Sequence, residues 1–317
     1  MITALAGGVG GAKLAHGLYM ELPPDSLTVI VNTADDAEMH GLRICPDLDT
    51  VLYTLAEMAN FETGWGIQGD SFRVLEQLGR LGRPDWFRLG DLDLATHIAR
   101  TDLLRAGAGL TEVTRRLATR LGVRANLLPM CDGRVETMVL TPDGELAFQD
   151  YFVRRHCADR VLSLRFQGIE QAVITPAVRE AIEEADAIVF CPSNPLVSLG
   201  PILSVPGMRA LIRERGVPII AVSPIIAGEA VRGPAARMLQ DLGHGASVVG
   251  VAHQYADLHP ILLIDEADRD LVSGVAETGV QPIVAPTLMR TAADRRALAR
   301  IVLDLAASPL TLSGSDR

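Results

Sequence analysis

The chain alternates short apolar segments with longer segments whose apolar residues recur every three or four positions. The first pattern predicts strands buried on both faces, and the second predicts helices. Strands that alternate with helices predict an α/β fold with a parallel sheet and right-handed crossovers. We expect strands at 1–6, 27–32, 187–190, 217–222, 247–251, 261–264 and 282–285, a helix starting at Gly11, and helices at 51–60, 71–79, 91–105, 111–122, 176–185 and 292–305.

The stretch from about 64 to 165 differs because helical patterns replace the buried strands. Residues 135–140 and 145–153 alternate apolar and polar positions around a Pro-Asp-Gly turn, which predicts a β-hairpin. A further strand is expected at 161–166. We therefore expect a single domain over residues 1–317, with 64–165 inserted over the sheet, and a frayed tail at 308–317.

A glycine-rich loop joins the first strand to the first helix. Gly8, Gly10 and Gly11 carry no Cβ, so the backbone can approach a phosphate closely, and the free N–H groups of the helix point at such an anion. Lys13 follows as the only lysine of the chain. The loop lacks the end of a Walker A motif and matches only the start of a dinucleotide fingerprint. We expect it to bind phosphate; the alternative is a plain tight turn.

Four carboxylates follow the second strand, at Asp35, Asp36, Asp47 and Asp49. Open α/β sheets bind ligands at the carboxyl ends of their strands, so we expect this cluster to hold a metal ion or a substrate hydroxyl. Alternatively, Asp47 or Asp49 caps the next helix. Asn32, a further nucleotide-binding candidate, ends the strand where a dinucleotide fold carries an acid, which argues against NAD.

Two later loops also follow strands. Residues 191–201 include Ser193 and Asn194, and hydroxyl and amide donors without an acid suit phosphate oxygens. The alternative is a turn closed by prolines. Residues 223–234 combine serine, glycine and Arg232, which is a further nucleotide or phosphate candidate.

Both tryptophans lie in joints of the 64–165 stretch, Trp65 in a glycine-rich joint and Trp86 shortly before Arg88. Tryptophan in such a joint can stack on a flat ring or simply cover the edge of the core. Arg88 can place a cation over such a ring or hold a phosphate.

Composition narrows the choice of partners. The net charge of −10 argues against nucleic-acid binding, which usually requires a basic face. The four cysteines lack metal-ligand spacing and indicate reduced thiols. We find no signal-peptide pattern and no apolar run long enough to span a membrane, so we expect a cytoplasmic protein.

The motifs at 7–13, 32–36, 46–50 and 191–201, taken in order, resemble those of the 2-phospho-L-lactate transferase family of coenzyme F-420 biosynthesis. The resemblance implies a Rossmann-like core with an insertion, a homodimer, and Mg²⁺. The implied enzyme transfers a phospholactyl, phosphoenolpyruvyl or phosphoglyceryl group from a guanosine diphosphate ester to the ribityl hydroxyl of the deazaflavin Fo (7,8-didemethyl-8-hydroxy-5-deazariboflavin) and releases GMP. It also implies that Fo lies against Asp49 and Arg88, and Arg232 departs from the lysine expected in the family.

The residue chemistry agrees with transfer from a diphosphate to an alcohol. The glycine loop, Lys13, Ser193 and Asn194 fit the diphosphate, and Trp65 fits the deazaflavin ring. Asp49 either orients the hydroxyl and accepts its proton or binds the metal. Two rival functions are a non-enzymatic nucleotide-sugar-binding regulator of the gluconeogenesis-factor type and an NAD-dependent oxidoreductase.

Overall fold

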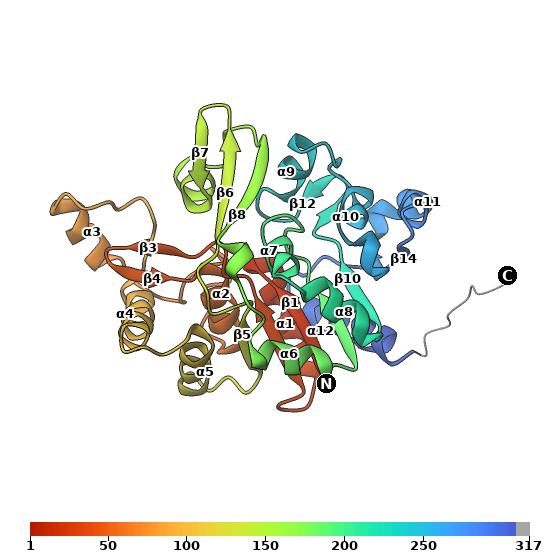
Figure 1. Cartoon of the computed structure of the whole chain (residues 1–317), viewed down its shortest axis with the longest axis horizontal. Coiled ribbons are helices and arrows are strands. Elements are labelled where there is room, and N and C mark those ends of the chain that lie inside the picture. Colours follow the sequence, from red (N-terminus) through yellow and green to blue (C-terminus); the bar gives the residue numbers. More distant parts are fainter. Residues whose placement is uncertain (309–317) are drawn as a thin grey trace.

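A seven-stranded sheet forms the centre of the computed structural model, which describes residues 1–308 (Figure 1). The strand order is β14-β13-β10-β9-β1-β2-β5, and every neighbouring pair is parallel. The expected α/β fold with a parallel sheet is therefore confirmed. The strands are β1 (Ile2–Ala6), β2 (Leu27–Val31), β5 (Asn126–Pro129), β9 (Ala187–Phe190), β10 (Ile219–Val222), β13 (Ile261–Ile264) and β14 (Gln281–Val284).

The direction of winding reverses between β1 and β9. From β1 the chain continues outward to β2 and β5, and from β9 it continues the other way to β10, β13 and β14. Such a reversal leaves a crevice outside the carboxyl ends of the two central strands, because the loops there turn to opposite sides. The topology therefore identifies the ends of β1 and β9 as the expected ligand site.

Helices cover both faces of the sheet (Figure 1). Helices α1, α2, α5 and α12 contribute to one core, and α6, α7, α8 and α10 to the other. The helices are α1 (Gly8–Glu21), α2 (Pro46–Leu55), α3 (Arg73–Arg80), α4 (Asp91–Arg105), α5 (Leu110–Arg120), α6 (Pro176–Glu183), α7 (Leu199–Ser204), α8 (Met208–Arg215), α9 (Ala235–Asp241), α10 (Val248–Tyr255), α11 (Val272–Glu277) and α12 (Ala292–Ala307).

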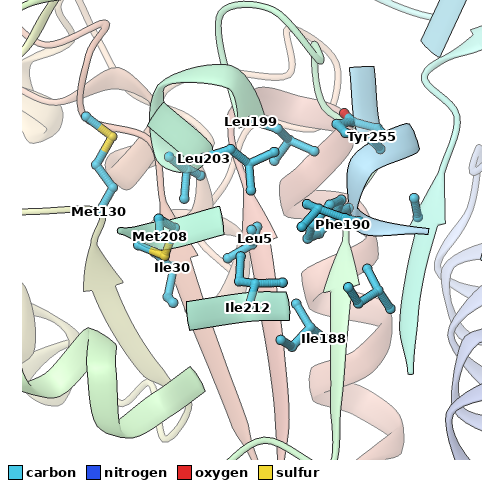
Figure 2. Packing of buried hydrophobic residues seen from close by; sticks show 14 of the residues in the cluster. Leu5, Ile30, Met130, Ile188, Phe190, Leu199, Leu203, Met208, Ile212 and Tyr255 are labelled. Atoms are coloured by element: carbon cyan, nitrogen blue, oxygen red, sulfur yellow. The ribbon is translucent and has the colours of Figure 1, made fainter. Parts of the chain in front are cut away.

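The side chains of successive strand residues pack alternately into the two cores, because side chains alternate between the faces of a sheet. Leu5 and Ile30 pack with Met208 and Ile212 on the face shown in Figure 2. Val29, the residue before Ile30, belongs to the opposite core. Burial on both faces explains why these strands read as continuous apolar runs in the sequence.

Smaller sheets surround the carboxyl end of the main sheet. Strands β6, β7 and β8 form an antiparallel sheet of order β7-β6-β8, which stands beyond the carboxyl ends of the main strands in Figure 1. The hairpin β3–β4 follows β2, and the short pair β11–β12 follows β10. Their bounds are β3 (Ala37–Met39), β4 (Leu42–Ile44), β6 (Glu136–Thr141), β7 (Gly144–Ala147), β8 (Ser163–Gln167), β11 (Ile225–Ile226) and β12 (Glu229–Ala230).

One expected strand is a helix. Residues 247–251 form the start of α10, where the Ser247 side chain caps the helix by accepting a hydrogen bond from the Gly250 N–H. A short apolar run fits a buried strand and a buried helix equally well, so its periodicity could not separate them. The strand expected at 145–153 is also too long, since β7 ends at Ala147 and a π-helical turn forms at Asp150–Arg154.

The sequence pattern missed β5, which pairs with β2 at the edge of the main sheet. This strand lies within 64–165, so that stretch returns to the main sheet before the small sheet begins. Two helices start earlier than expected: α1 begins at Gly8, and α2 begins at Pro46, a residue whose fixed φ suits the first turn. Of the tail expected to fray, residues 309–317 lie outside the described residues.

Candidate active site at the carboxyl ends of the strands

The glycine loop packs directly against the loop that follows β9. A Cβ on Gly11 would lie 2.5 Å from the Ser193 Oγ, and a Cβ on Gly10 would overlap the Pro192 carbonyl oxygen. Gly8 adopts a φ of +61°, which L side chains rarely reach. Close packing therefore requires glycine at 10 and 11, and the backbone conformation favours it at 8. Together they bring the N-terminal end of α1 to the reversal point of the sheet.

Three polar residues that we expected to contact the nucleotide hold these loops in place. The Ser193 hydroxyl accepts a hydrogen bond from the Gly7 N–H (3.0 Å) and donates one to the Gly7 carbonyl (2.8 Å). The Asn194 side chain accepts from the Leu196 N–H (2.9 Å). The Asn32 amide donates to the Asp47 Oδ2 (2.9 Å) and the Val197 carbonyl (3.2 Å). The side chains thus fix the loop geometry. Ser193 occupies the Gly7 N–H and Asp47 the Gly8 N–H, so the N–H groups of Val9 and Gly10 in the first turn of α1 are left for a ligand.

Asp35 and Asp47 lie together beside the glycine loop. Asp47 accepts the hydrogen bond from Asn32, and its Oδ2 would be 2.7 Å from a Cβ at Gly7. Burial, followed by the charge of Asp47, raises the pKa of Asp35 well above its usual value, and burial also raises the pKa of Asp47. Asp35 Oδ1 is buried without a hydrogen-bond partner. Hard divalent cations prefer oxygen ligands. Two neighbouring buried carboxylates, one of them with an unpartnered oxygen, therefore fit such a cation.

Asp36 has a cationic partner of its own. The Arg43 Nη2 lies 2.9 Å from the Asp36 Oδ2, and both side chains are largely covered. Burial raises the pKa of Asp36 to about 6, although the Arg43 charge acts in the opposite direction. This pair ties the loop after β2 to β4, and it leaves Asp36 less suited to a metal than Asp35.

Asp49 belongs to a second buried network with α4. Both terminal nitrogens of Arg100 bind the Asp49 carboxylate, one of them at 3.0 Å. His97 lies 3.6 Å from Asp49 and 3.2 Å from Asp93, which accepts a hydrogen bond from the Tyr53 hydroxyl (2.7 Å). Asp47 and Asp49 lie in the first turn of α2, but the side chain of its N-cap, Cys45, makes no capping hydrogen bond.

The structure thus divides the expected carboxylate cluster into two possible metal sites. Asp47 lies against the glycine loop with Asp35 close to it, whereas Asp49, Asp93 and His97 offer ligand atoms within 4.8 Å of one another. Arg100 already neutralises Asp49 in the second group. Asp93 and His97 were missed by sequence reasoning because they lie about fifty residues beyond Asp49, on a separate helix.

Trp65 and Arg88 meet at a third residue, Phe72. The Trp65 and Phe72 rings lie edge to face with centroids 6.5 Å apart, and the Arg88 guanidinium lies 4.1 Å from the Phe72 ring centroid. Trp65 is 39% exposed, so its ring remains available for stacking. The two expected deazaflavin contacts therefore form one aromatic and cationic surface, and Phe72 is the member that the sequence did not indicate.

A cavity of about 350 Å³ lies against the loop that carries Asp35 and Asp36, which we call the aspartate loop. Its wall includes Asp35 and Asp36, aromatic residues Trp86 and Phe148, and residues of β3 and β6. Trp65, Arg88 and Asp49 do not line it. Trp86 thus lines a cavity to which Trp65 does not contribute.

Lys13 and Arg232 come from distant parts of the sequence to the α1–α12 side of the site. The Lys13 Nζ donates to the Met289 carbonyl (3.0 Å), and Arg232 donates to the Thr63 carbonyl. Arg295 of α12 lies close enough to lower the pKa of Lys13. Sequence reasoning missed Arg295 because it lies in an arginine-rich amphipathic helix with no motif around it.

A family profile and individual relatives identify the same family. A profile described as "2-phospho-L-lactate transferase CofD" matches residues 2–292. A protein of Streptomyces griseus named phosphoenolpyruvate transferase is 44% identical over 311 residues, covering 96% of this chain and 98% of the relative. A protein of Methanosarcina acetivorans named 2-phospho-L-lactate transferase is 42% identical over 301 residues, covering 95% and 97%.

Solved structures show the same fold. A protein of the UPF0052 family from Bacillus halodurans superposes with a TM-score of 0.66 and 16% identity, covering 95% of this chain and 98% of that one. At this identity the likeness concerns the fold alone. Within residues 1–308, we find no helix with the length and apolarity needed to cross a membrane.

Proposed function

The chain belongs to the 2-phospho-L-lactate transferase CofD family of coenzyme F-420 biosynthesis, and on this basis we propose the reaction that it catalyses. We propose transfer of a phospholactyl, phosphoenolpyruvyl or phosphoglyceryl group from a guanosine diphosphate ester to the ribityl hydroxyl of Fo, with release of GMP. The observation that carries the proposal is the placement of the glycine loop beside the buried carboxylates at the reversal point of the sheet.

The donor diphosphate would bind at the start of α1. The free N–H groups and the positive end of the helix dipole stabilise phosphate charge there. Ser193, Asn194 and Asn32 would support the loops through the hydrogen bonds described above, and Arg232 and Lys13 would add positive charge from the α12 side. Residues 223–234 are the candidate guanine contacts.

A divalent cation fits the Asp35–Asp47 pair, and we propose that it is Mg²⁺. Bound there, it would neutralise negative charge on the diphosphate. The carboxylates supply the oxygen ligands, and the unpartnered Asp35 Oδ1 is free to coordinate. Asp36 and Asp49 are weaker candidates, because Arg43 and Arg100 already neutralise them.

The acceptor would bind between Asp49 and the surface formed by Trp65, Phe72 and Arg88. The aromatic surface suits a flat ring, and Arg88 can bind its polar edge. The paired contact with Arg100 fixes the orientation of Asp49, so this carboxylate can hold the ribityl hydroxyl and accept its proton during attack. Product mass will identify the three-carbon acid, since the two relatives at 44% and 42% identity carry different names.

The comparisons give no support to the regulator alternative, and the UPF0052 likeness concerns the fold alone. We further propose that the enzyme acts in the cytoplasm as a homodimer on these small-molecule substrates, without nucleic acid or membrane partners.

A fluorescence titration with Fo, with and without GDP and Mg²⁺, tests this function. We expect micromolar binding by the wild type and at least tenfold weaker binding by Asp49→Asn, because a neutral amide holds the hydroxyl less strongly than the carboxylate does. Asp102→Asn is the matched control, since Asp102 is exposed on α4. Failure to bind Fo under all conditions, with nucleotide-sugar binding intact, would instead favour the regulator.

A further inference from the structure

Three cationic side chains converge beside α1 and α12, and we call Lys13, Arg232 and Arg295 the basic cluster. Both arginines are close enough to act on the charge of Lys13. Arg295 is only 5% exposed, with its guanidinium 4.5 Å from the centroid of the Phe61 ring and its Nη1 3.4 Å from the His16 Nδ1. The cluster therefore joins α1, α12 and the loops after α2 and β10.

The basic cluster has no acidic partner among residues 1–308. None of its members forms an ion pair there, although other arginines of α12 do: Arg296 and Arg300 both bind Glu21. The Arg295 Nε is buried without a hydrogen-bond partner. Glu57 is the acid that acts nearby, and it acts on His16.

Burial and mutual repulsion make this arrangement costly for the protein alone. Burial, then Arg295, then Arg232 lower the pKa of Lys13, and burial lowers the pKa of Arg295. Buried charges in proteins are normally paired, because an unpaired charge loses its hydration without compensation. Of the three cations, Arg295 is buried, Lys13 is half-buried and Arg232 is exposed. A buried arginine with an unpartnered N–H group and two further cations nearby has the features of a site for a negatively charged ligand.

The basic cluster lies within reach of a ligand bound at the glycine loop. Lys13 follows Gly8 by five residues on α1, which is about 7.5 Å along the helix axis. Helical side chains lean toward the N-terminus, so Lys13 leans toward the glycine loop. A ligand with one phosphate at the loop can thus present a second anionic group to the cluster.

We propose that Lys13, Arg232 and Arg295 together bind a second anionic group of the donor substrate, with Arg295 as a donor-binding residue. The group is an oxyanion, either a nucleotide phosphate or the carboxylate of the three-carbon acid. The identity of the donor rests on the proposed function, whereas the ability of the cluster to bind an oxyanion does not.

The single lysine allows a direct measurement on the unmodified sequence. Protein labelled with [ε-¹³C]lysine gives one ε-methylene signal in NMR spectra, because Lys13 is the only lysine. We expect pyrophosphate to shift this signal saturably and to raise the pKa of Lys13, since an added anion offsets the repulsion from Arg295 and Arg232. His16 and Glu57 are the other titratable groups nearby, and the titration is repeated in His16→Gln to remove the nearer one.

Variants of α12 provide the matched comparison. We expect Arg295→Met to weaken pyrophosphate and donor binding about 10- to 100-fold, because charge-assisted contacts are lost. Arg295→Lys should recover part of the affinity. Arg296→Met is the control, since Arg296 is the exposed neighbour paired with Glu21. The Lys13 signal of the wild type tests the proposal even if Arg295→Met fails to fold.

The choice of ligand distinguishes the two sources of the oxyanion. Weaker binding of GDP and GMP by Arg295→Met assigns the cluster to the α-phosphate, and weaker binding of GDP alone assigns it to the β-phosphate. Unchanged nucleotide binding with weaker binding of 2-phospho-L-lactate assigns it to the carboxylate. Unchanged affinity for all of these ligands, or no response of the Lys13 signal, would overturn the proposal.

These outcomes remain separate from those of the proposed function. Fo binding by the wild type is measured in parallel as a separate readout of the acceptor site. A protein that binds oxyanions at the cluster but never binds Fo would retain this inference and lose the transferase reaction. The opposite result would retain the acceptor site and remove the cluster from donor binding.

Discussion

At the scale of single residues, the contact between Asp49 and Arg100 has the largest consequence. Both side chains are buried, and Arg100 binds Asp49 with both terminal nitrogens. A buried ion pair adds little net stability, but the loss of one partner leaves an uncompensated charge in a region of low polarity. The pair therefore fixes the orientation of Asp49 and makes that orientation difficult to change.

Substitution of Arg100 by a neutral residue should therefore destabilise the folded protein strongly. We expect Arg100→Met to reduce the free energy of unfolding by about 3–5 kcal/mol, because Asp49 and Asp93 then lie buried near His97 without the arginine. Urea unfolding monitored by circular dichroism measures this loss.

The control is Arg115→Met on α5, where an exposed arginine pairs with Glu112 (2.7 Å). This substitution should reduce the free energy of unfolding by less than about 1 kcal/mol, as expected for a surface ion pair. Equal effects of the two substitutions would show that the buried pair has no special structural role.

At the scale of elements, the decisive contact is between the loops after β1 and β9. Each loop alone looks like an ordinary glycine or proline turn, and neither sequence shows that they touch. In the structure, the Ser193 hydroxyl bonds both backbone groups of Gly7, and Gly10 packs against the Pro192 carbonyl. The geometry of the proposed phosphate site at the start of α1 therefore depends on a residue 186 positions away.

A single methyl group should separate these two loops. We expect Gly10→Ala to weaken GDP binding at least tenfold, because its Cβ would overlap the Pro192 carbonyl and displace the glycine loop. Isothermal titration calorimetry with GDP measures the change.

Gly133→Ala is the matched substitution, since nothing lies within 4 Å of a Cβ there. GDP affinity that is preserved in Gly10→Ala would indicate that the loops can separate without loss of the phosphate site.

At the scale of the whole molecule, the parts built around the carboxyl end of the sheet create two aromatic surfaces. One is formed by Trp65, Phe72 and Arg88, and the other lines the cavity that contains Trp86. Gln149 connects the small sheet to the aspartate loop by donating to the Asp35 carbonyl (2.8 Å). The cavity therefore adjoins Asp35 and Asp36, whereas Trp65, Phe72 and Arg88 form a separate surface, and the position of the deazaflavin ring can be tested between the two.

We expect Trp65→Leu to weaken Fo binding about 5- to 30-fold, because stacking of a flat ring on an aromatic side chain contributes about 1–2 kcal/mol. Trp86→Leu should change the affinity less than twofold. Fo fluorescence with each variant measures both effects. The reverse result would place the ring in the cavity that Trp86 lines.

The sequence alone determined the local character of this protein. Apolar runs and glycine positions predicted most strands of the parallel sheet, because burial on both faces leaves a continuous apolar pattern. The exceptions are instructive: α10 and β5 are short segments for which local pattern is ambiguous, and only their neighbours in the fold determine whether they become helix or strand.

Only the tertiary structure determines which candidate residues are paired with each other and which remain available to a ligand. Four nearby aspartates look equivalent in the sequence, yet Arg43 and Arg100 pair with Asp36 and Asp49 and leave Asp35 and Asp47 facing each other. Arg295 likewise meets Lys13 across 282 residues of chain. Charge pairing and burial depend on distances in space between distant segments, so no local pattern in the sequence contains them.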